Sequence, residues 1–338
     1  MSYMGKLLTG WRTYRRRSYP TRGLVVCVVL AFNLTIHRPL GAAQESGAEP
    51  MTVISYNPVL LPDSAQGKNL ALRISVSARG GHLPIVIFSH GAQYLKDDYI
   101  PLTEFWAANG FVVIQPTHIE SRSLALPKDD PRLAAVWRSR AEDLRHIIDS
   151  LDQVARLVPE LKGRMDKDRI YAAGHSFGGH TTSLLLGARV NEPGQGGTLL
   201  DRRVKGGILM APPGLAKGFL NVSWDHIDAP MLVIAGNQDL TAGVNDAWEY
   251  HADPYFKSPG SGKAVKCLAV LDGMSHYLGG ILGTNHTEER HPEPESVKAI
   301  QQITLAFFNE KFDKHEEGVF SAYVAGKRPK ILSQVECK

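Results

Sequence analysis

Apolar residues in this chain gather in short, almost continuous runs, and polar or amphipathic segments separate one run from the next. The runs are PIVIFSHG (84–91), FVVIQP (111–116), RIYAAGHS (169–176), VKGGILMAPP (204–213), PMLVIAGNQD (230–239) and AVKCLAVLDG (264–273). Continuous rather than alternating apolar residues indicate strands that are covered on both faces. The pattern therefore predicts a mostly parallel sheet.

Helical spacing occurs between these runs. In RAEDLRHIIDSLDQVARLV (140–158) and PESVKAIQQITLAFFNEKF (294–312), apolar residues recur every three or four positions. Ahead of the first continuous run, MTVISYN (51–57) and LALRISV (70–76) are typical of an antiparallel pair of strands. Strands alternating with helices predict an α/β fold, with a mostly parallel, doubly wound sheet and helices on both faces.

Two long connections belong to neither kind of element, residues 117–133 and residues 278–295. Each follows the carboxyl end of a predicted strand, which is where open α/β sheets bind ligands. Connections of this length in a compact domain are more often functional than idle. A lid over a binding site is one interpretation of both segments.

The charge is unevenly distributed. The formal net charge is +4, but residues 1–43 hold seven basic side chains and no acid, so the remainder carries −3. This balance gives no support to a nucleic-acid partner. The leader continues with an apolar run (23–36), shorter than the roughly 20 residues of a spanning helix, and then small residues.

The leader therefore predicts a signal peptide, residues 1–43, cut after Ala43, followed by a single domain over 44–338. Export to the periplasm or outside the cell follows from cleavage. An uncleaved N-terminal anchor is the alternative, and it would give the protein its membrane contact. Cleavage leaves Cys267 and Cys337, which would form a disulfide in an oxidising compartment or else remain free thiols.

The segment GHSFG, Gly174 to Gly178, stands between a predicted strand and a predicted helix. A serine flanked in this way by glycines is typical of the nucleophile elbow, a strained corner that lifts the hydroxyl above the sheet. The context is more specific than the five residues alone. Ser176 is therefore the predicted nucleophile, and the amino end of the following helix would favour an oxyanion.

A serine needs a base and an orienting acid. This topology places each on the loop after a later strand, in the order serine, acid, histidine. Asp239 follows PMLVIAG and His276 follows CLAVLDG, so they are the predicted acid and base; Asp201 and Asp228 are alternative acids. Taken alone, Asp239 would be read as a turn or cap residue and His276 as a packed loop residue.

The developing oxyanion needs two N–H donors. Phe177 follows the nucleophile and is the first predicted donor. Ala92, after the strand PIVIFSHG, is the second, with Gly91 permitting the turn. His90 is interpreted as structural.

These segments resemble the α/β-hydrolase superfamily over nearly all of residues 51–315. PIVIFSHG, GFVVIQPTH and GHSFGGHT are similar to dienelactone-hydrolase-like proteins and platelet-activating-factor acetylhydrolases, with cutinase-type polyester hydrolases as more distant relatives. The resemblance implies hydrolysis of a carboxylic ester through an acyl-serine, without metal or organic cofactor. It matches Ser176, Phe177, Ala92 and His276 to the family's positions.

Two departures weaken the inference about substrate. The acetylhydrolases place their acid after the strand that follows the nucleophile helix, where this chain has MAPPGLAKG (210–218) without Asp or Glu. Dienelactone hydrolases use a cysteine where this chain has Ser176. The predicted substrate is a small to medium acyl ester, small-molecule or lipid-like, such as a short-chain phospholipid or a polyester. A peptidase, an acyltransferase or a non-catalytic binding protein of the same fold are the alternatives.

Residues outside the predicted triad give weaker signals. A possible metal site is disfavoured because no ligand spacing stands out at His286 and His291. Arginines near the first long connection are interpreted as solvated helix charges rather than an anion site, and four apolar residues as either pocket lining or surface packing. They are Arg122, Arg132, Arg138 and Arg140, and Trp137, Tyr94, Leu124 and Leu126.

Overall fold

The structure is a computed structural model, and it describes most of the chain. The described residues are 33–37, 51–63, 68–190, 197–215, 222–240, 247–260, 264–283, 293–312 and 318–338. Among these residues no helix has the length and apolar character needed to cross a membrane. The predicted leader lies largely outside them, so cleavage and anchoring stay predictions.

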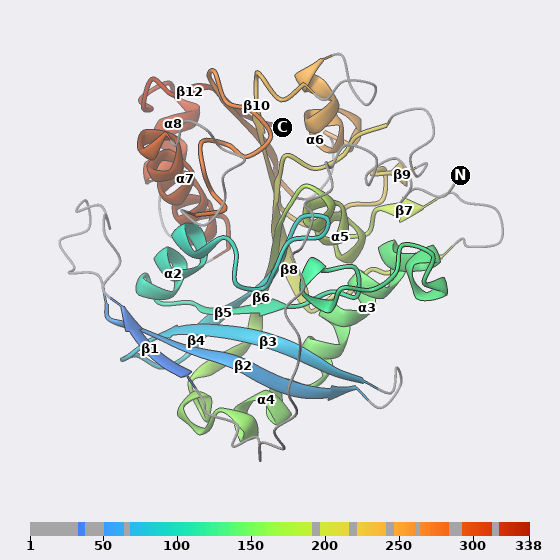
Figure 1. The fold of residues 1–338 in the computed structure, drawn as a ribbon. Coiled ribbons are helices and arrows are strands. Elements are labelled where there is room, and N and C mark those ends of the chain that lie inside the picture. The colour runs from blue at the N-terminus through green and yellow to red at the C-terminus, as the bar shows by residue number, and fades with distance from the viewer. Residues whose placement is uncertain are drawn as a thin grey trace, which may run out of the picture.

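A twisted sheet runs through the molecule (Figure 1), in the strand order β1-β2-β3-β5-β4-β6-β8-β10-β11-β12. Its central strands pair in parallel. They are β4 (Leu83–Ser89), β5 (Val112–Pro116), β6 (Met165–His175), β8 (Val204–Met210), β10 (Met231–Gly236) and β11 (Lys266–Leu271). The predicted doubly wound, mostly parallel α/β architecture is confirmed.

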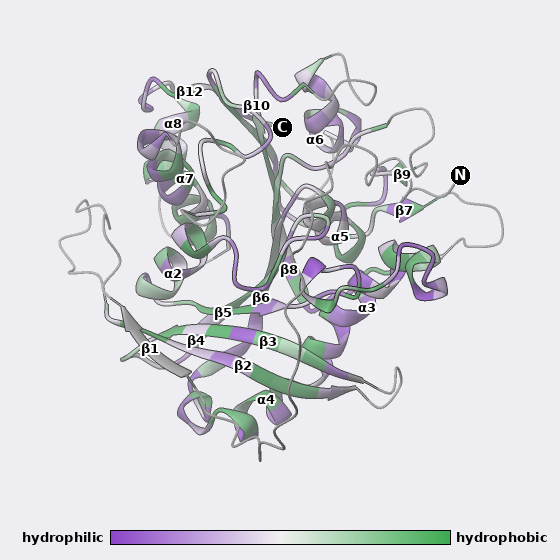
Figure 2. Ribbon diagram, in the orientation of Figure 1, coloured by the Kyte–Doolittle hydropathy of each residue, from purple (hydrophilic) through white to green (hydrophobic). Residues whose placement is uncertain are grey.

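Helices cover both faces of the sheet (Figure 1), and each face has its own apolar core. One face carries α2 (Ile100–Ala108), α7 (Pro294–Phe312) and α8 (Val319–Val324). The other carries α3 (Val136–Asp149), α4 (Leu151–Leu157), α5 (Phe177–Leu185) and α6 (Asp253–Lys257). Figure 2 shows apolar residues along the central strands. The continuous apolar runs in the sequence are thus explained by burial from two sides.

Some predicted elements have different bounds in the structure. The helix predicted over 140–158 is divided, because Ser150 leaves the helical region (φ −108°, ψ 15°) between α3 and α4. The connection 117–133 holds two short 3-10 turns. The remaining small elements are η1 (Arg122–Leu124), η2 (Pro131–Ala135), η3 (Pro159–Leu161), η4 (Trp248–Ala252), β7 (Arg189–Val190) and β9 (Val222–Ser223).

Antiparallel strands form both margins of the sheet. On one side β3 (Lys68–Ser77) pairs with β2 (Val53–Asp63), as the sequence predicts, and β2 pairs with β1 (Asn33–His37). On the other side β12 (Leu332–Cys337) pairs with β11. The structure joins Cys267 to Cys337 by a disulfide across these two strands, one of the two states that the sequence left open.

Candidate active site

Ser176 is the single residue between strand β6 and helix α5. Its backbone has φ 54° and ψ −121°, a region that residues with a side chain seldom adopt. This is the strand-corner-helix geometry of a nucleophile elbow. The corner exposes part of the serine, although β6 and α5 are otherwise buried around it.

Glycines make this corner possible because neighbouring backbone passes too close for a side chain. A Cβ atom on Gly174 would lie 2.3 Å from the carbonyl of Gly178. A Cβ atom on Gly178 would lie 1.9 Å from the carbonyl oxygen of Ser89 at the end of β4. The elbow can therefore sit directly against the loop that follows β4.

The structure brings the predicted nucleophile, base and acid together. Ser176 Oγ lies 2.9 Å from Nε2 of His276, and Nδ1 of His276 lies 2.9 Å from Oδ2 of Asp239. Asp239 and His276 follow β10 and β11, so both reach the site from the carboxyl ends of neighbouring strands. The His276 side chain is 26% exposed and that of Asp239 only 1%. We call these three residues the accessible triad.

The alternative acids lie elsewhere. Asp201 precedes β8 and accepts hydrogen bonds from the Arg203 guanidinium at 2.9 and 2.6 Å. Asp228 precedes β10 and is exposed. Both thus stand before the amino ends of their strands, whereas the accessible triad assembles at the carboxyl ends.

A second histidine touches Asp239. Nε2 of His251, from η4, lies 3.1 Å from Oδ1 of Asp239, and Nδ1 of His251 lies 2.9 Å from the carbonyl oxygen of Pro212. Burial would raise the pKa of the Asp239 carboxyl, but His276 and His251 outweigh it and hold the pKa well below its ordinary value. Asp239 is therefore ionised at neutral pH.

A buried relay connects the base loop to the loop after β4. The carbonyl oxygen of His276 can only accept, so Nε2 of His175 donates to it across 2.7 Å. Nδ1 of His175 lies 3.0 Å from the hydroxyl of Tyr99, which accepts from the Gly91 N–H at 3.0 Å. Burial, then the neighbouring charge of His276, lowers the pKa of His175 to about 3, so its ring is neutral.

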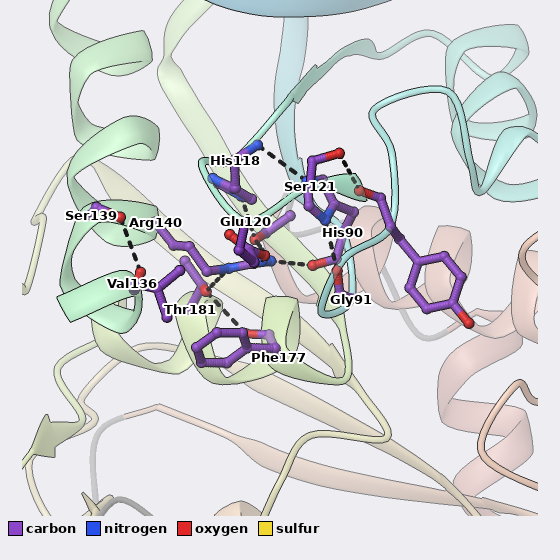
Figure 3. A network of polar contacts seen from close by, with 12 residues as sticks. His90, Gly91, His118, Glu120, Ser121, Val136, Ser139, Arg140, Phe177 and Thr181 are labelled. Atoms are coloured by element: carbon purple, nitrogen blue, oxygen red, sulfur yellow. Dashed lines mark hydrogen bonds and ion pairs between the residues drawn. The ribbon is translucent and has the colours of Figure 1, made fainter. Parts of the chain in front are cut away.

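Arg140 connects the loop after β4 to helix α5 (Figure 3). Its guanidinium donates to the carbonyl oxygen of His90, two residues before Ala92, and to Oγ1 of Thr181 at 3.1 Å. It also lies over the ring of Phe177, 4.7 Å from the centroid. One side chain therefore contacts both segments that carry the predicted oxyanion donors, Ala92 and Phe177.

Arg140 corrects one prediction. The sequence predicts a solvated helix charge at this position, yet the Arg140 side chain is completely buried and paired with buried Glu120. A buried cation is tolerated only when it is paired and hydrogen-bonded, and Glu120 together with the acceptors in Figure 3 meets that need. Arg132 is an exposed charge as predicted, bound to Asp130.

Behind the elbow lies a second serine, histidine and aspartate arrangement, Ser89, His118 and Asp143, which we call the buried triad. Ser89 Oγ lies 2.9 Å from Nε2 of His118, and Nδ1 of His118 lies 2.8 Å from Oδ2 of Asp143. The side chains of His118 and Asp143 have no exposed surface. Arg140 donates to Ser89 Oγ at 3.0 Å.

The remaining predicted residues do not gather at one place. Trp137, a residue of α3, is buried in the core, and Leu124 is 44% exposed. Tyr94 is buried with its ring 6.3 Å from that of Tyr277, next to His276. Leu126 packs partly buried against the same core as Trp137. His286 and His291 lie outside the described residues.

The other two arginines have local partners. Arg122 lies over the Tyr94 ring, 5.2 Å from its centroid, and 3.5 Å from Asp98. Arg138 lies over the ring of Trp137 at 4.8 Å. Arg122 is thus paired with the segment after β4 and Arg138 with a neighbour on its own helix, and these contacts define no shared anion site.

Within the described part of the chain, Asp239, His251 and His276 form the one group of three possible metal ligands, with their ligand atoms within 4.8 Å of one another. Every one of those residues already has a protein contact: a hydrogen bond or ion pair within the accessible triad or to Pro212. These three side chains are therefore better suited to hold one another in the triad than to bind a metal cation.

Sequence reasoning missed several residues around the site. His118 carries the same signal as His276, a histidine directly after a buried strand, and could have been found by that rule. Tyr99, Arg140 and His251 belong to no motif, and each acts through a partner many positions away in the chain.

Comparison with known proteins gives independent evidence of the family to which this chain belongs. Residues 86–301 match the family described as "Alpha/beta hydrolase family". Cutinase 1 of Thermobifida cellulosilytica is 28% identical over 230 residues, covering 65% of this chain and 74% of the relative. Cutinase of Thermobifida fusca (strain YX) is 28% identical over 230 residues, covering 65% and 64%. Cutinase est2 of Thermobifida alba is 30% identical over 236 residues, covering 70% and 61%. This chain thus spans less than two thirds of the length of the latter two.

Proposed function

Because this chain belongs to the alpha/beta hydrolase family, we propose that it is a serine esterase that cleaves carboxylic esters through an acyl-enzyme. The observation that carries the proposal is the hydrogen-bonded order Ser176, His276, Asp239 at the carboxyl edge of the sheet. Acyl transfer requires an accessible serine beside a histidine that can accept its proton, and Ser176 and His276 have this arrangement.

In the proposed reaction Ser176 Oγ attacks the ester carbonyl carbon while Nε2 of His276 takes the serine proton. The N–H groups of Ala92 and Phe177 stabilise the oxyanion, and the amino end of α5 adds to that stabilisation. The intermediate collapses, the C–O bond to the alcohol breaks, and His276 returns the proton to the leaving alcohol. Water, activated by His276, then hydrolyses the acyl-serine and releases the carboxylic acid.

We propose a small to medium acyl ester as substrate, with polyesters as the leading subclass. Support comes from the relatives, which carry the name cutinase, the more distant of the family resemblances in the sequence. The proposal needs no metal or organic cofactor, because the triad supplies both the nucleophile and the proton transfers.

Export is a second part of the proposal. The basic and apolar leader supports it, and so does the disulfide between Cys267 and Cys337, because such bonds persist in oxidising compartments. We expect expressed full-length chain to be recovered outside the cytoplasm with its N-terminus after Ala43. Recovery in the membrane with the leader attached would favour the anchor instead.

The test of function is hydrolysis of p-nitrophenyl esters from acetate to palmitate, beside release of soluble acids from an aliphatic polyester film. A fluorophosphonate label is applied to wild type and Ser176→Ala. We expect turnover and labelling in the wild type and neither in the variant. Faster transfer to added amine or alcohol than to water would favour an acyltransferase, and absence of both signals in the wild type would favour a binding protein.

A further inference from the structure

His251 stands between two groups that can only accept hydrogen bonds. The ring is buried, with 4% of the residue exposed. Nδ1 lies 2.9 Å from the Pro212 carbonyl oxygen, and Nε2 lies 3.1 Å from Oδ1 of Asp239. A neutral imidazole carries one N–H, so it would point a lone pair at one of these oxygens. Only the ring with hydrogen on both nitrogens suits both neighbours.

His175 shows the opposite case in the same site. Its Nε2 faces an acceptor, the carbonyl oxygen of His276, but its Nδ1 faces the Tyr99 hydroxyl, which can donate. One hydrogen is then sufficient, and burial favours the neutral ring. Two histidines of similar burial thus have different hydrogen requirements, set by the atoms that face them.

We propose that His251 is a doubly protonated positioning residue, which holds Oδ1 of the Asp239 carboxylate while His276 holds Oδ2, and which offsets the charge of the carboxylate. This inference rests on the proposed function, in which Asp239 orients the base. Each carboxylate oxygen of Asp239 then faces a histidine nitrogen, Oδ2 at 2.9 Å from His276 and Oδ1 at 3.1 Å from His251.

The charge on His251 has a consequence for the reaction. The His251 and His276 rings lie 5.2 Å apart, so the positive charge of His251 opposes the charge that His276 acquires on taking the serine proton. Among the described residues, His175 and Tyr250 are further titratable groups near His251, and the acid Asp253 lies close to Tyr250. We therefore expect activity to extend to lower pH than a triad with an unshared carboxylate would allow.

The direct test is nitrogen NMR of the ¹⁵N-histidine-labelled full chain at pH 7.5, with the His251 signals identified by their loss in His251→Gln. We expect both ring nitrogens of His251 to be protonated and those of His175 to show one protonated and one bare nitrogen. An unprotonated ring nitrogen on His251 would overturn the proposal. It would also be overturned if the His251 nitrogen signals shifted on addition of zinc and returned on addition of a chelator. This readout needs no ester turnover, so it is independent of the Ser176→Ala test.

Kinetics tests the role. His251→Gln keeps an N–H donor but removes the charge, and we expect the acid limb of kcat/KM to move up by about one to two pH units. His251→Phe removes the donor, and we expect kcat to fall about tenfold with KM unchanged. His146→Gln, which alters a half-buried histidine bound to the Pro62 carbonyl far from the accessible triad in the chain, is the matched control and should behave as wild type. An unshifted acid limb in His251→Gln would refute the positioning role.

Discussion

The accessible triad and the buried triad contain the same residue types in the same hydrogen-bond order. The serine to histidine distance is 2.9 Å in both, and the histidine to aspartate distance is 2.9 Å in one and 2.8 Å in the other. By distance alone the two are indistinguishable. They lie at the ends of neighbouring parallel strands, β6 and β4.

Their surroundings separate them. Ser176 is partly exposed on a strained corner at the amino end of α5, whereas Ser89 is completely buried at the end of β4. The Ser89 hydroxyl also accepts a hydrogen bond from Arg140 at 3.0 Å, which engages one of the two lone pairs of its oxygen. We therefore expect access and the proposed oxyanion donors, rather than hydrogen-bond order alone, to determine which serine acts as the nucleophile.

Removing the serine hydroxyl from each triad in turn should give the largest difference in activity between the two. We expect Ser176→Ala to lower kcat by roughly 10⁴- to 10⁶-fold with unchanged stability, because the nucleophile is lost. Ser89→Ala should leave kcat within tenfold and cost about 1–3 kcal/mol in urea unfolding, because Arg140 and His118 lose a partner. Similar losses of turnover in both variants would break the distinction.

The aspartates of the two triads, Asp239 and Asp143, should show the same contrast: loss of activity in the accessible triad and loss of stability in the buried one. Asp239→Asn is expected to lower kcat by roughly 10³- to 10⁴-fold, since the carboxylate that orients His276 is lost. Asp143→Asn should mainly reduce stability, because its partner His118 is buried. Asp228→Asn, on an exposed residue, is the control for steady-state kinetics and urea melts. An equal kinetic loss in that control would unseat Asp239.

Arg140 offers a way to perturb the buried region without touching the accessible triad. Arg140→Met leaves Glu120 buried without its cation, and we expect a loss of about 3–5 kcal/mol in unfolding free energy. Adding Glu120→Gln removes the uncompensated charge and should recover most of it. If Arg140 also sets the oxyanion donors, the double variant stays folded while its kcat remains low at unchanged KM. Full recovery of kcat in the double variant would mean that Arg140 contributes to stability alone and does not position the oxyanion donors.

Acidification should affect stability through one set of histidines and activity through another. Burial, then Arg140, lowers the pKa of His180 to about 3, and burial foremost lowers the pKa of His90. Between about pH 6.5 and 3 these histidines bind protons in the unfolded chain but stay unprotonated in the folded protein. The free energy of unfolding therefore decreases as pH falls. The expected slope is up to about 1.4 kcal/mol per pH unit for each such group.

Urea midpoints across this range, compared with His180→Gln, check the slope, which should be shallower in the variant. Activity should also fall on acidification, because His276 must be unprotonated to accept the serine proton. Activity that survived unchanged to strongly acidic pH would contradict that assignment of the base.

The sequence predicted those features that depend on periodicity or on position after a strand. Continuous apolar runs identified the parallel strands because both faces of the sheet are covered. The loops after β10 and β11 supplied Asp239 and His276 because the carboxyl ends of adjacent parallel strands meet at one edge. Helix bounds were less certain, as the break at Ser150 shows.

Residues whose role depends on one distant partner escaped prediction. Arg140 sits on an amphipathic helix among exposed charges, and only the assembled fold shows that it points inward at Glu120 and the His90 carbonyl. His251 meets Asp239 through a loop whose path the sequence does not encode in any repeat or spacing. Burial of a polar side chain is a tertiary property, so a one-dimensional pattern contains no signal for it.

The disulfide and the leader together bear on how copies of this protein behave toward one another. The outermost strand on one side, β12, is fastened to β11 through Cys337, and on the other side the outermost strand, β1, lies within the predicted leader. Reduction would loosen the first, and cleavage after Ala43 would remove the second and leave β2 as a border. Unpaired strand borders are templates for self-association. If the leader is cut and the disulfide reduced, we therefore expect both outer borders of the sheet to be less protected and copies of the protein to associate more readily.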